Sequence, residues 1–98
     1  METVALIARL KPGSEEQAAQ LLAAGPPFDP SARGLSRHAV YLSAGEVVFV
    51  FEGDEVEWIV EEMVSEPASG SLAAALDAWR ELVDGPPRIA RAAYSWSA

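Results

Sequence analysis

The 98-residue sequence predicts an α+β fold in which a four-stranded antiparallel sheet carries helices on one face. Three observations support this prediction: apolar runs of strand length, amphipathic stretches of helix length, and glycine and proline residues at the junctions. Along the chain these segments follow the order β-α-β-β-α-α-β. A split β-α-β, or ferredoxin-like, arrangement in one domain spanning residues 1–98 satisfies this order most simply.

The first strand and the first helix lie in the first quarter of the chain. A nearly continuous apolar run over 3–10 is typical of a strand that is covered on both faces. A helix is predicted over 14–24, because Ser14 and Gln17 have the spacing of a capping box. Gly25, which two prolines follow, ends this helix.

A loop and a β-hairpin come next. The segment 26–34 contains three prolines and a glycine, and a loop of this length in a small domain often covers a pocket. Strands are predicted at 35–43 and 46–52, joined by the two-residue turn Ala44-Gly45.

Pairing Ser43 with Glu46 sets the hairpin register and therefore determines which side chains share a face. His38 is then expected to lie beside Phe49 and Phe51. The complete face carries Ser36, His38, Val40, Leu42, Val47, Phe49 and Phe51, and the opposite face carries Arg37, Ala39, Tyr41, Val48, Val50 and Glu52.

Two helices and a last strand complete the fold. The second helix is predicted to start at a capping box formed by Asp54 and Glu57 and to stop at Pro67. A glycine- and serine-containing break at 68–71 precedes the third helix. The final strand is predicted over 88–96.

The composition excludes several classes of function. The chain has 7 Lys and Arg against 15 Asp and Glu, a net charge of −8, which argues against binding to nucleic acids and to anionic membranes. It has no cysteine and one histidine, so neither a disulfide nor a thiolate or multi-histidine metal site can form. Apolar runs are too short to span a membrane, and no leader pattern opens the sequence. A cytoplasmic protein without a metal or a cofactor is expected.

A strongly acidic stretch lies between His38 and Trp79. It contains no Lys or Arg, and its acidic residues are Glu46, Glu52, Asp54, Glu55, Glu57, Glu61, Glu62, Glu66 and Asp77. Such a stretch can dock a basic partner or hold a divalent cation. The spacing fits no calcium loop, however, and a solvated helix face that keeps the protein soluble is the favoured interpretation.

All four predicted strands carry apolar or aromatic residues on both faces, although helices cover only one face of such a sheet. The second face must therefore be buried by something else, and a second copy of the chain is the simplest candidate. The sequence thus predicts a homodimer in which two sheets pack face to face as an α+β barrel.

Four segments of the chain have a distinctive sequence: Ala5 to Pro12, Gly34 leading into Arg37-His38, Glu52-Gly53-Asp54, and Tyr94-Ser95-Trp96-Ser97-Ala98. In this order they resemble the small aromatic-polyketide cyclases of the tetracenomycin cyclase type, within the dimeric α+β barrel superfamily. The wider group includes cofactor-free monooxygenases and stress-responsive proteins. The resemblance implies a homodimer with one ligand cavity per subunit, in which acid/base chemistry folds and dehydrates a polyphenolic substrate.

The resemblance also implies site residues. It places a basic residue of the second strand at His38, which is therefore the candidate catalytic acid or base. It implies a histidine where this chain has Phe49, and acid/base side chains where it has Ala24-Gly25. The remaining candidates are Arg37 and Arg91 for binding an oxyanion, and Phe49, Phe51, Tyr94 and Trp96 for lining the pocket.

Each of these candidates has a structural alternative. The arginines can form ion pairs with an acid such as Glu46 or Glu52, and the aromatic residues can belong to the core or to a dimer interface. A lone histidine in a sheet can serve packing alone. Whether the protein is an enzyme therefore stays open. The alternative function is a non-catalytic barrel that binds a small apolar ligand or a protein partner.

Overall fold

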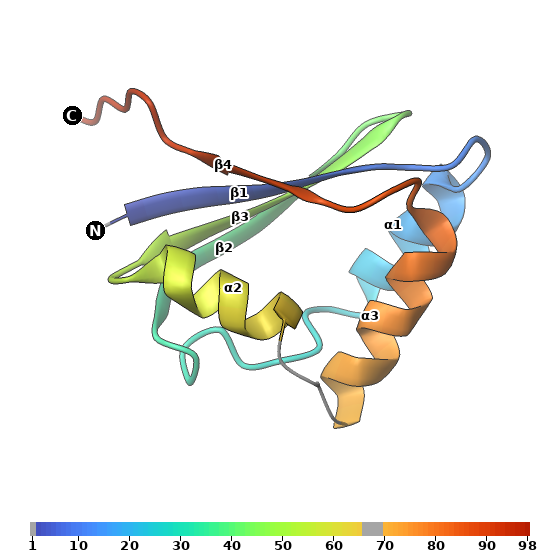
Figure 1. Ribbon diagram of the computed structural model, residues 1–98, viewed down its shortest axis with the longest axis horizontal. Helices are drawn as coiled ribbons and strands as arrows, with labels where there is room; N and C mark the ends of the chain where they lie inside the picture. The colour runs from blue at the N-terminus through green and yellow to red at the C-terminus, as the bar shows by residue number, and fades with distance from the viewer. Residues whose placement is uncertain (1, 66–69) are drawn as a thin grey trace.

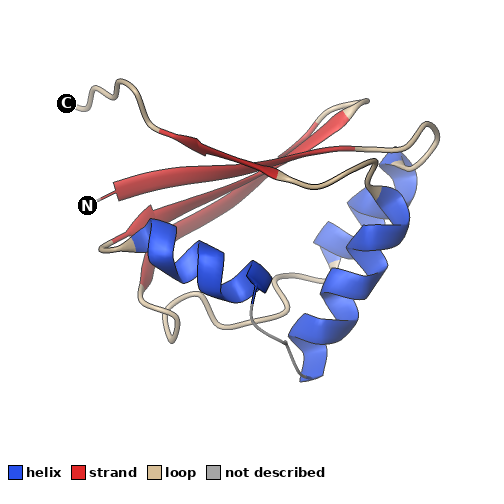
Figure 2. Ribbon diagram, in the orientation of Figure 1, coloured by secondary structure: helices blue, strands red, loops and turns tan. Residues whose placement is uncertain are grey.

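The structure is a computed structural model that describes residues 2–65 and 70–98. These residues form a four-stranded sheet in the order β2-β3-β1-β4, in which every neighbouring pair is antiparallel. The helices lie on one side of the sheet (Figures 1 and 2). The predicted ferredoxin-like α+β class is confirmed. The elements are β1 (Glu2–Arg9), α1 (Glu15–Ala23), β2 (Leu35–Leu42), β3 (Glu46–Gly53), α2 (Val56–Ser65), α3 (Gly70–Leu82) and β4 (Arg88–Arg91).

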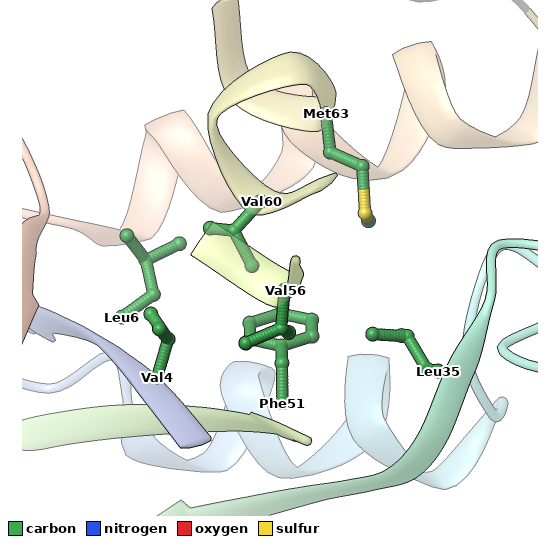
Figure 3. Close-up of a cluster of buried hydrophobic side chains, with 7 residues drawn as sticks. All are labelled: Val4, Leu6, Leu35, Phe51, Val56, Val60 and Met63. Carbon is green, nitrogen blue, oxygen red and sulfur yellow. The ribbon is translucent and has the colours of Figure 1, made fainter. Parts of the chain in front are cut away.

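Two clusters of buried apolar side chains hold the helices on the sheet. The first lies under α2 and consists of Val4, Leu6, Leu35, Phe51, Val56, Val60 and Met63 (Figure 3). The second lies under α1 and α3 and consists of Ala8, Leu10, Ala18, Val47 and Leu82. Burying one large apolar side chain contributes roughly 1.5–3 kcal/mol. The helix-facing side of the sheet is therefore the main source of stability within one chain.

The β2–β3 hairpin has the predicted register, with His38 opposite Phe51 and Arg37 opposite Glu52. The faces predicted for the hairpin therefore hold from Arg37 to Leu42 and from Val47 to Glu52, but not at Ser36. The register shifts between Leu35 and Arg37, where β2 contains a bulge. Because a bulge changes the alternation of side chains along a strand, Leu35 joins the buried core while Arg37 lies on the opposite face.

The loop over 26–34 closes tightly onto the end of β3. A Cβ atom added to Gly53 would lie 2.9 Å from the carbonyl oxygen of Gly34, a distance that real Cβ atoms essentially never show. Gly34 itself has a φ of 84°, in the left-handed region that favours glycine. The two glycines therefore allow the loop to approach the sheet and to lead directly into β2.

The capping box predicted for α1 does not form. Ser14 has helical dihedral angles, φ −93° and ψ −3°, and its side chain makes no capping hydrogen bond. A capping side chain reaches the first turn when its own backbone is extended, which the backbone of Ser14 is not.

At the start of α2, Glu57 accepts hydrogen bonds from Arg91 with both carboxylate oxygens.

The last strand is shorter than predicted. Strand β4 ends at Arg91, which pairs with Val4, and the N–H of Ala92 donates to the carbonyl of Thr3 at 3.3 Å. Strand β1 begins at Glu2, so residues from Tyr94 onward would lie beyond β1 if this register continued. They consequently have no strand partner in β1, and the tail extends past the sheet (Figure 1).

The junction between α2 and α3 is only partly described. The predicted stop at Pro67 and the first part of the predicted break at 68–71 lie outside the described residues. The later part of that break is helical, because α3 begins at Gly70.

The sheet face that points away from the helices is mainly apolar at its centre. Ala5, Ile7, Ala39, Val48 and Val50 on this face are half-buried. Ion pairs lie at its borders, with Arg37 on Glu52 at 2.7 Å and Arg88 on Glu46 at 3.6 Å. We call this surface the open sheet face. In the part of the chain that the structure describes, no helix is long and apolar enough to cross a membrane.

Candidate functional site

His38 lies on the helix-facing side of β2, the strand at one edge of the sheet, and is half-buried. Its imidazole ring stacks on the ring of Phe51 from the neighbouring strand, with centroids 4.7 Å apart and an interplanar angle of 22°. Phe51 is only 4% exposed and belongs to the core cluster under α2. The core thus fixes one ring beside His38.

A backbone carbonyl orients the imidazole ring. Nδ1 of His38 lies 3.0 Å from the carbonyl oxygen of Val50. Because a carbonyl oxygen only accepts hydrogen bonds, Nδ1 carries the hydrogen and donates it. In the neutral ring Nε2 then has a lone pair and can accept a proton or a hydrogen bond. This arrangement is the one required of a general base that acts through Nε2.

A second phenylalanine reaches His38 from the loop over 26–34. The ring of Phe28 is half-buried, and its centroid lies 5.5 Å from that of His38 at an angle of 47°. Phe28 was not among the residues predicted for the site. The signal was the loop itself, whose length and proline content predict that it covers a pocket.

Phe49 lies on the same face of the sheet as His38 but contacts a helix. Its ring meets Trp79 of α3 edge-on, with centroids 5.2 Å apart and an angle of 84°. It packs against both core clusters. Phe49 therefore packs in the core on the same face of the sheet as His38, and its side chain supplies no acid or base.

Arg37 lies on the open sheet face and therefore points away from His38. Its guanidinium donates to the Glu52 carboxylate at 2.7 Å and lies 3.5 Å from the Tyr41 hydroxyl. These hydrogen bonds, the one to Glu52 first, raise the pKa of Arg37 above its ordinary value. This is the ion pair that sequence analysis gave as the structural alternative.

Arg91 lies on β4, at the sheet edge opposite to β2, and binds the helix α2. Its guanidinium donates two parallel hydrogen bonds to the Glu57 carboxylate. They lower the pKa of Glu57 below its ordinary value of 4.5. Within one chain, Arg91 is therefore occupied by a structural ion pair and lies far from His38 in strand order.

Tyr94 and Trp96 lie in the tail beyond β4 and are 83% and 77% exposed. Of the seven predicted site residues, one chain brings together His38, Phe49 and Phe51. It does not bring Arg37, Arg91, Tyr94 or Trp96 to them.

A separate open hollow of about 530 Å³ lies at the start of α2. Its lining residues are Glu2, Glu55, Glu57, Trp58 and Glu61. It corresponds to part of the acidic stretch, which sequence analysis interpreted as a solvated surface. In residues 2–65 and 70–98, no group of three or more acidic or histidine side chains is placed to hold a metal ion.

The order of the helices and strands and the antiparallel sheet place this chain among small ferredoxin-like α+β domains. No protein-family description and no curated protein matches the chain. Solved structures do match it over almost its whole length, and three of them are informative.

The first is tetracenomycin F2 cyclase from Streptomyces glaucescens, a type-II polyketide cyclase, with 16% identity and a TM-score of 0.67 over 98% of this chain and 97% of that chain. The second is a protein of unknown function from Nitrosomonas europaea, with 22% identity and a TM-score of 0.60. The match covers 100% of this chain and 96% of that chain. The third is a protein from Chloroflexus aurantiacus J-10-fl that is provisionally assigned as an antibiotic biosynthesis monooxygenase, with 16% identity and a TM-score of 0.55. The match covers 98% of this chain and 96% of that chain. At these identities the likeness shows a shared fold, which is the fold that the family resemblance implies.

Proposed function

We propose that this protein binds a planar phenolic small molecule at His38 and transforms it by acid/base chemistry without a cofactor. The observation that carries the proposal is the geometry of His38. The carbonyl of Val50 accepts a hydrogen bond from Nδ1, and the ring of Phe51 stacks on the imidazole and fixes its plane. In the neutral ring Nε2 can then accept a proton. The similarity in fold to a type-II polyketide cyclase supports the same class of substrate.

The chemistry that one imidazole can perform is a proton relay. Nε2 takes a proton from an activated carbon or hydroxyl of the substrate, and the imidazolium returns that proton to another atom of the same substrate. The aromatic surroundings favour a flat ligand, because aromatic rings stack on one another at centroid distances of about 4.5–7 Å.

We also propose that the working form is a cytoplasmic homodimer, joined through the open sheet face. The half-buried apolar centre of that face supports this, because a large apolar surface is otherwise left in water. Tyr94 and Trp96 are exposed within one chain, and we assign them to contacts with the second copy. The acidic, cysteine-free composition is in keeping with the cytoplasm.

A pair of substitutions at His38 tests the catalytic role. In His38→Asn the side-chain amide nitrogen takes the position of Nδ1 and keeps the donor to Val50, whereas in His38→Gln it takes the position of Nε2. The assay is the exchange of ring hydrogens of orcinol, a small diphenol, with D2O, followed by NMR. General acid/base catalysis contributes roughly 100- to 10,000-fold, so both variants should lose at least about 100-fold in the exchange rate.

The control is the binding of alizarin, a planar three-ring phenol, measured by fluorescence. His38→Asn should retain the fold and most of this binding. Exchange that proceeds equally in the wild type and in both variants would rule out the catalytic role.

The second candidate is a non-catalytic binding protein. It is favoured by the apolar character of the side chains that contact His38 and by the presence of Phe49 where the resemblance implies a histidine. This candidate predicts that alizarin binds to the wild type and that no protein-dependent exchange of orcinol occurs.

A further inference from the structure

We propose that Phe28 is the ring that closes over His38, and that a planar ligand reaches Nε2 by taking the place of this ring. The inference rests on the proposed function for the identity of the ligand. The closing role of Phe28 can be measured without any ligand.

The two phenylalanines beside His38 differ in how they are held. Phe51 belongs to a strand, is 4% exposed and lies inside the core cluster under α2. Phe28 belongs to a loop, is half-buried and packs against the edge of that cluster. Moving Phe51 would disrupt the core, whereas moving Phe28 uncovers only the edge of the cluster. Phe28 is therefore the one of these two side chains that can move away from His38 without disrupting the core.

The loop has anchored ends on both sides of Phe28. Before it, the N–H of Gly25 donates to the carbonyl of Leu22 at 3.0 Å and ends α1. After it, the backbone N–H of Ser31 donates to the Asp29 carboxylate at 3.0 Å, and the N–H of Leu35 donates to the carbonyl of Pro30 at 3.0 Å. A short segment between two fixed points can swing one side chain without loss of these anchors.

The position of Phe28 suits exchange with a flat ligand. Its centroid lies 5.5 Å from the imidazole, inside the range at which aromatic rings attract each other. A phenolic ring in that place would keep an aromatic contact with His38 and could direct its hydroxyl at Nε2, which Phe28 cannot bond. The gain of that hydrogen bond favours the ligand over Phe28. Phe28 is accordingly the residue that determines which ligands enter.

The test uses the fact that His38 is the sole histidine in the sequence. Diethyl pyrocarbonate reacts with an accessible, unprotonated imidazole: the ring nitrogen attacks the carbonyl carbon, an N–C bond forms, and ethyl carbonate leaves as ethanol and carbon dioxide. The absorbance of carbethoxyhistidine then reports the accessibility of His38 alone. Phe28→Ala should raise the rate about three- to tenfold, because it removes one aromatic contact. Phe28→Leu should fall between this variant and the wild type.

Ile89→Ala is the matched control. It removes a half-buried apolar side chain from the same cluster, but on β4 at the opposite edge of the sheet. Its rate should equal that of the wild type. Equal rates in Phe28→Ala and the wild type, or an equal acceleration in Ile89→Ala, would overturn the closing role. Phe28→Leu, which conserves apolar volume, keeps the test valid if the alanine variant does not fold.

Alizarin separates this inference from the proposed function. If alizarin displaces Phe28, it should protect His38 from carbethoxylation, and Phe28→Ala should bind it about three- to tenfold more tightly. Binding and protection that are unchanged by Phe28→Ala would refute the exchange while leaving the proposed site intact. A faster carbethoxylation of Phe28→Ala without any binding of alizarin would support the closing role and contradict the proposed ligand.

Discussion

The carbonyl of Val50 decides what the side chain of His38 can do. By accepting from Nδ1 at 3.0 Å, it sets the tautomer and leaves the lone pair of the neutral ring on Nε2. Asparagine can preserve this bond and glutamine cannot, which is why these two substitutions are paired in the test of function. A residue that served packing alone would tolerate either change without an effect on proton exchange.

Part of this residue-scale arrangement could be predicted from the sequence. The hairpin register follows from the turn and from alternation, and it correctly places His38 beside Phe51. The hydrogen bond to Val50 could not be predicted, because it depends on a side-chain torsion that no pattern encodes. Phe28 was missed since the direction of a side chain within a proline-rich loop has no periodicity.

At the scale of elements, one ion pair links the last strand to the second helix. Arg91 donates to both carboxylate oxygens of Glu57 and so connects β4 to α2. The sequence offered ion pairs with an acid such as Glu46 or Glu52 as the structural alternative for the arginines, which is correct for Arg37 with Glu52 but not for Arg91. The acid on α2 could not be predicted, because the position of a helix over a sheet is set by packing.

This ion pair predicts a pH dependence of stability. The pKa of Glu57 is lowered in the folded protein, so the unfolded protein binds more protons below the ordinary value of 4.5. The stabilisation is therefore complete above that value and is lost as the pH falls through the lowered pKa. Thermal unfolding of Arg91→Gln should show a lower Tm than the wild type at neutral pH, and the difference should shrink as the pH falls below 4.5 and through the lowered pKa of Glu57.

Arg80→Gln is the control for this prediction. Its partner Asp77 lies three residues away on the same exposed helix face, so the pair connects no two elements. Its effect on the Tm should be smaller than that of Arg91→Gln at neutral pH. A Tm difference for Arg91→Gln that is constant from neutral to acidic pH would show that the ion pair is not the cause.

At the scale of the whole molecule, the open sheet face and the tail are the features that one chain leaves unexplained. The sequence predicted them in part, because apolar residues on both faces of every strand require a second cover. The length of β4 was predicted wrongly, since a strand-like pattern says nothing about where its partner strand ends. The predicted strand ran from 88 to 96, whereas β4 ends at Arg91, and the residues after it form no strand in the part of the chain that the structure describes.

A charge at the centre of the open sheet face should separate the copies. Val48 is half-buried and lies opposite Ile7 and Tyr41 on that face. If the proposed homodimer forms through this face, Val48→Glu should yield a folded monomer, because an unpaired carboxylate cannot be buried in an apolar interface without a cost of several kcal/mol. Sedimentation equilibrium measures the mass, and circular dichroism checks the fold.

Gln20→Glu adds the same charge on the exposed surface of α1 and should remain dimeric. A wild type that sediments as a monomer would contradict the homodimer, and a Val48→Glu variant that remains dimeric would exclude the open sheet face as its interface.

Nε2 of His38 is the reactive atom of the proposed site for planar phenols. The most direct test is an NMR spectrum of the imidazole nitrogens of protein labelled at its single histidine, recorded without and with alizarin. The structure predicts hydrogen on Nδ1 and a free lone pair on Nε2, and a shift of the Nε2 resonance when alizarin is added. Hydrogen on Nε2 in the free neutral protein, or an Nε2 resonance that alizarin leaves unchanged, would contradict the account.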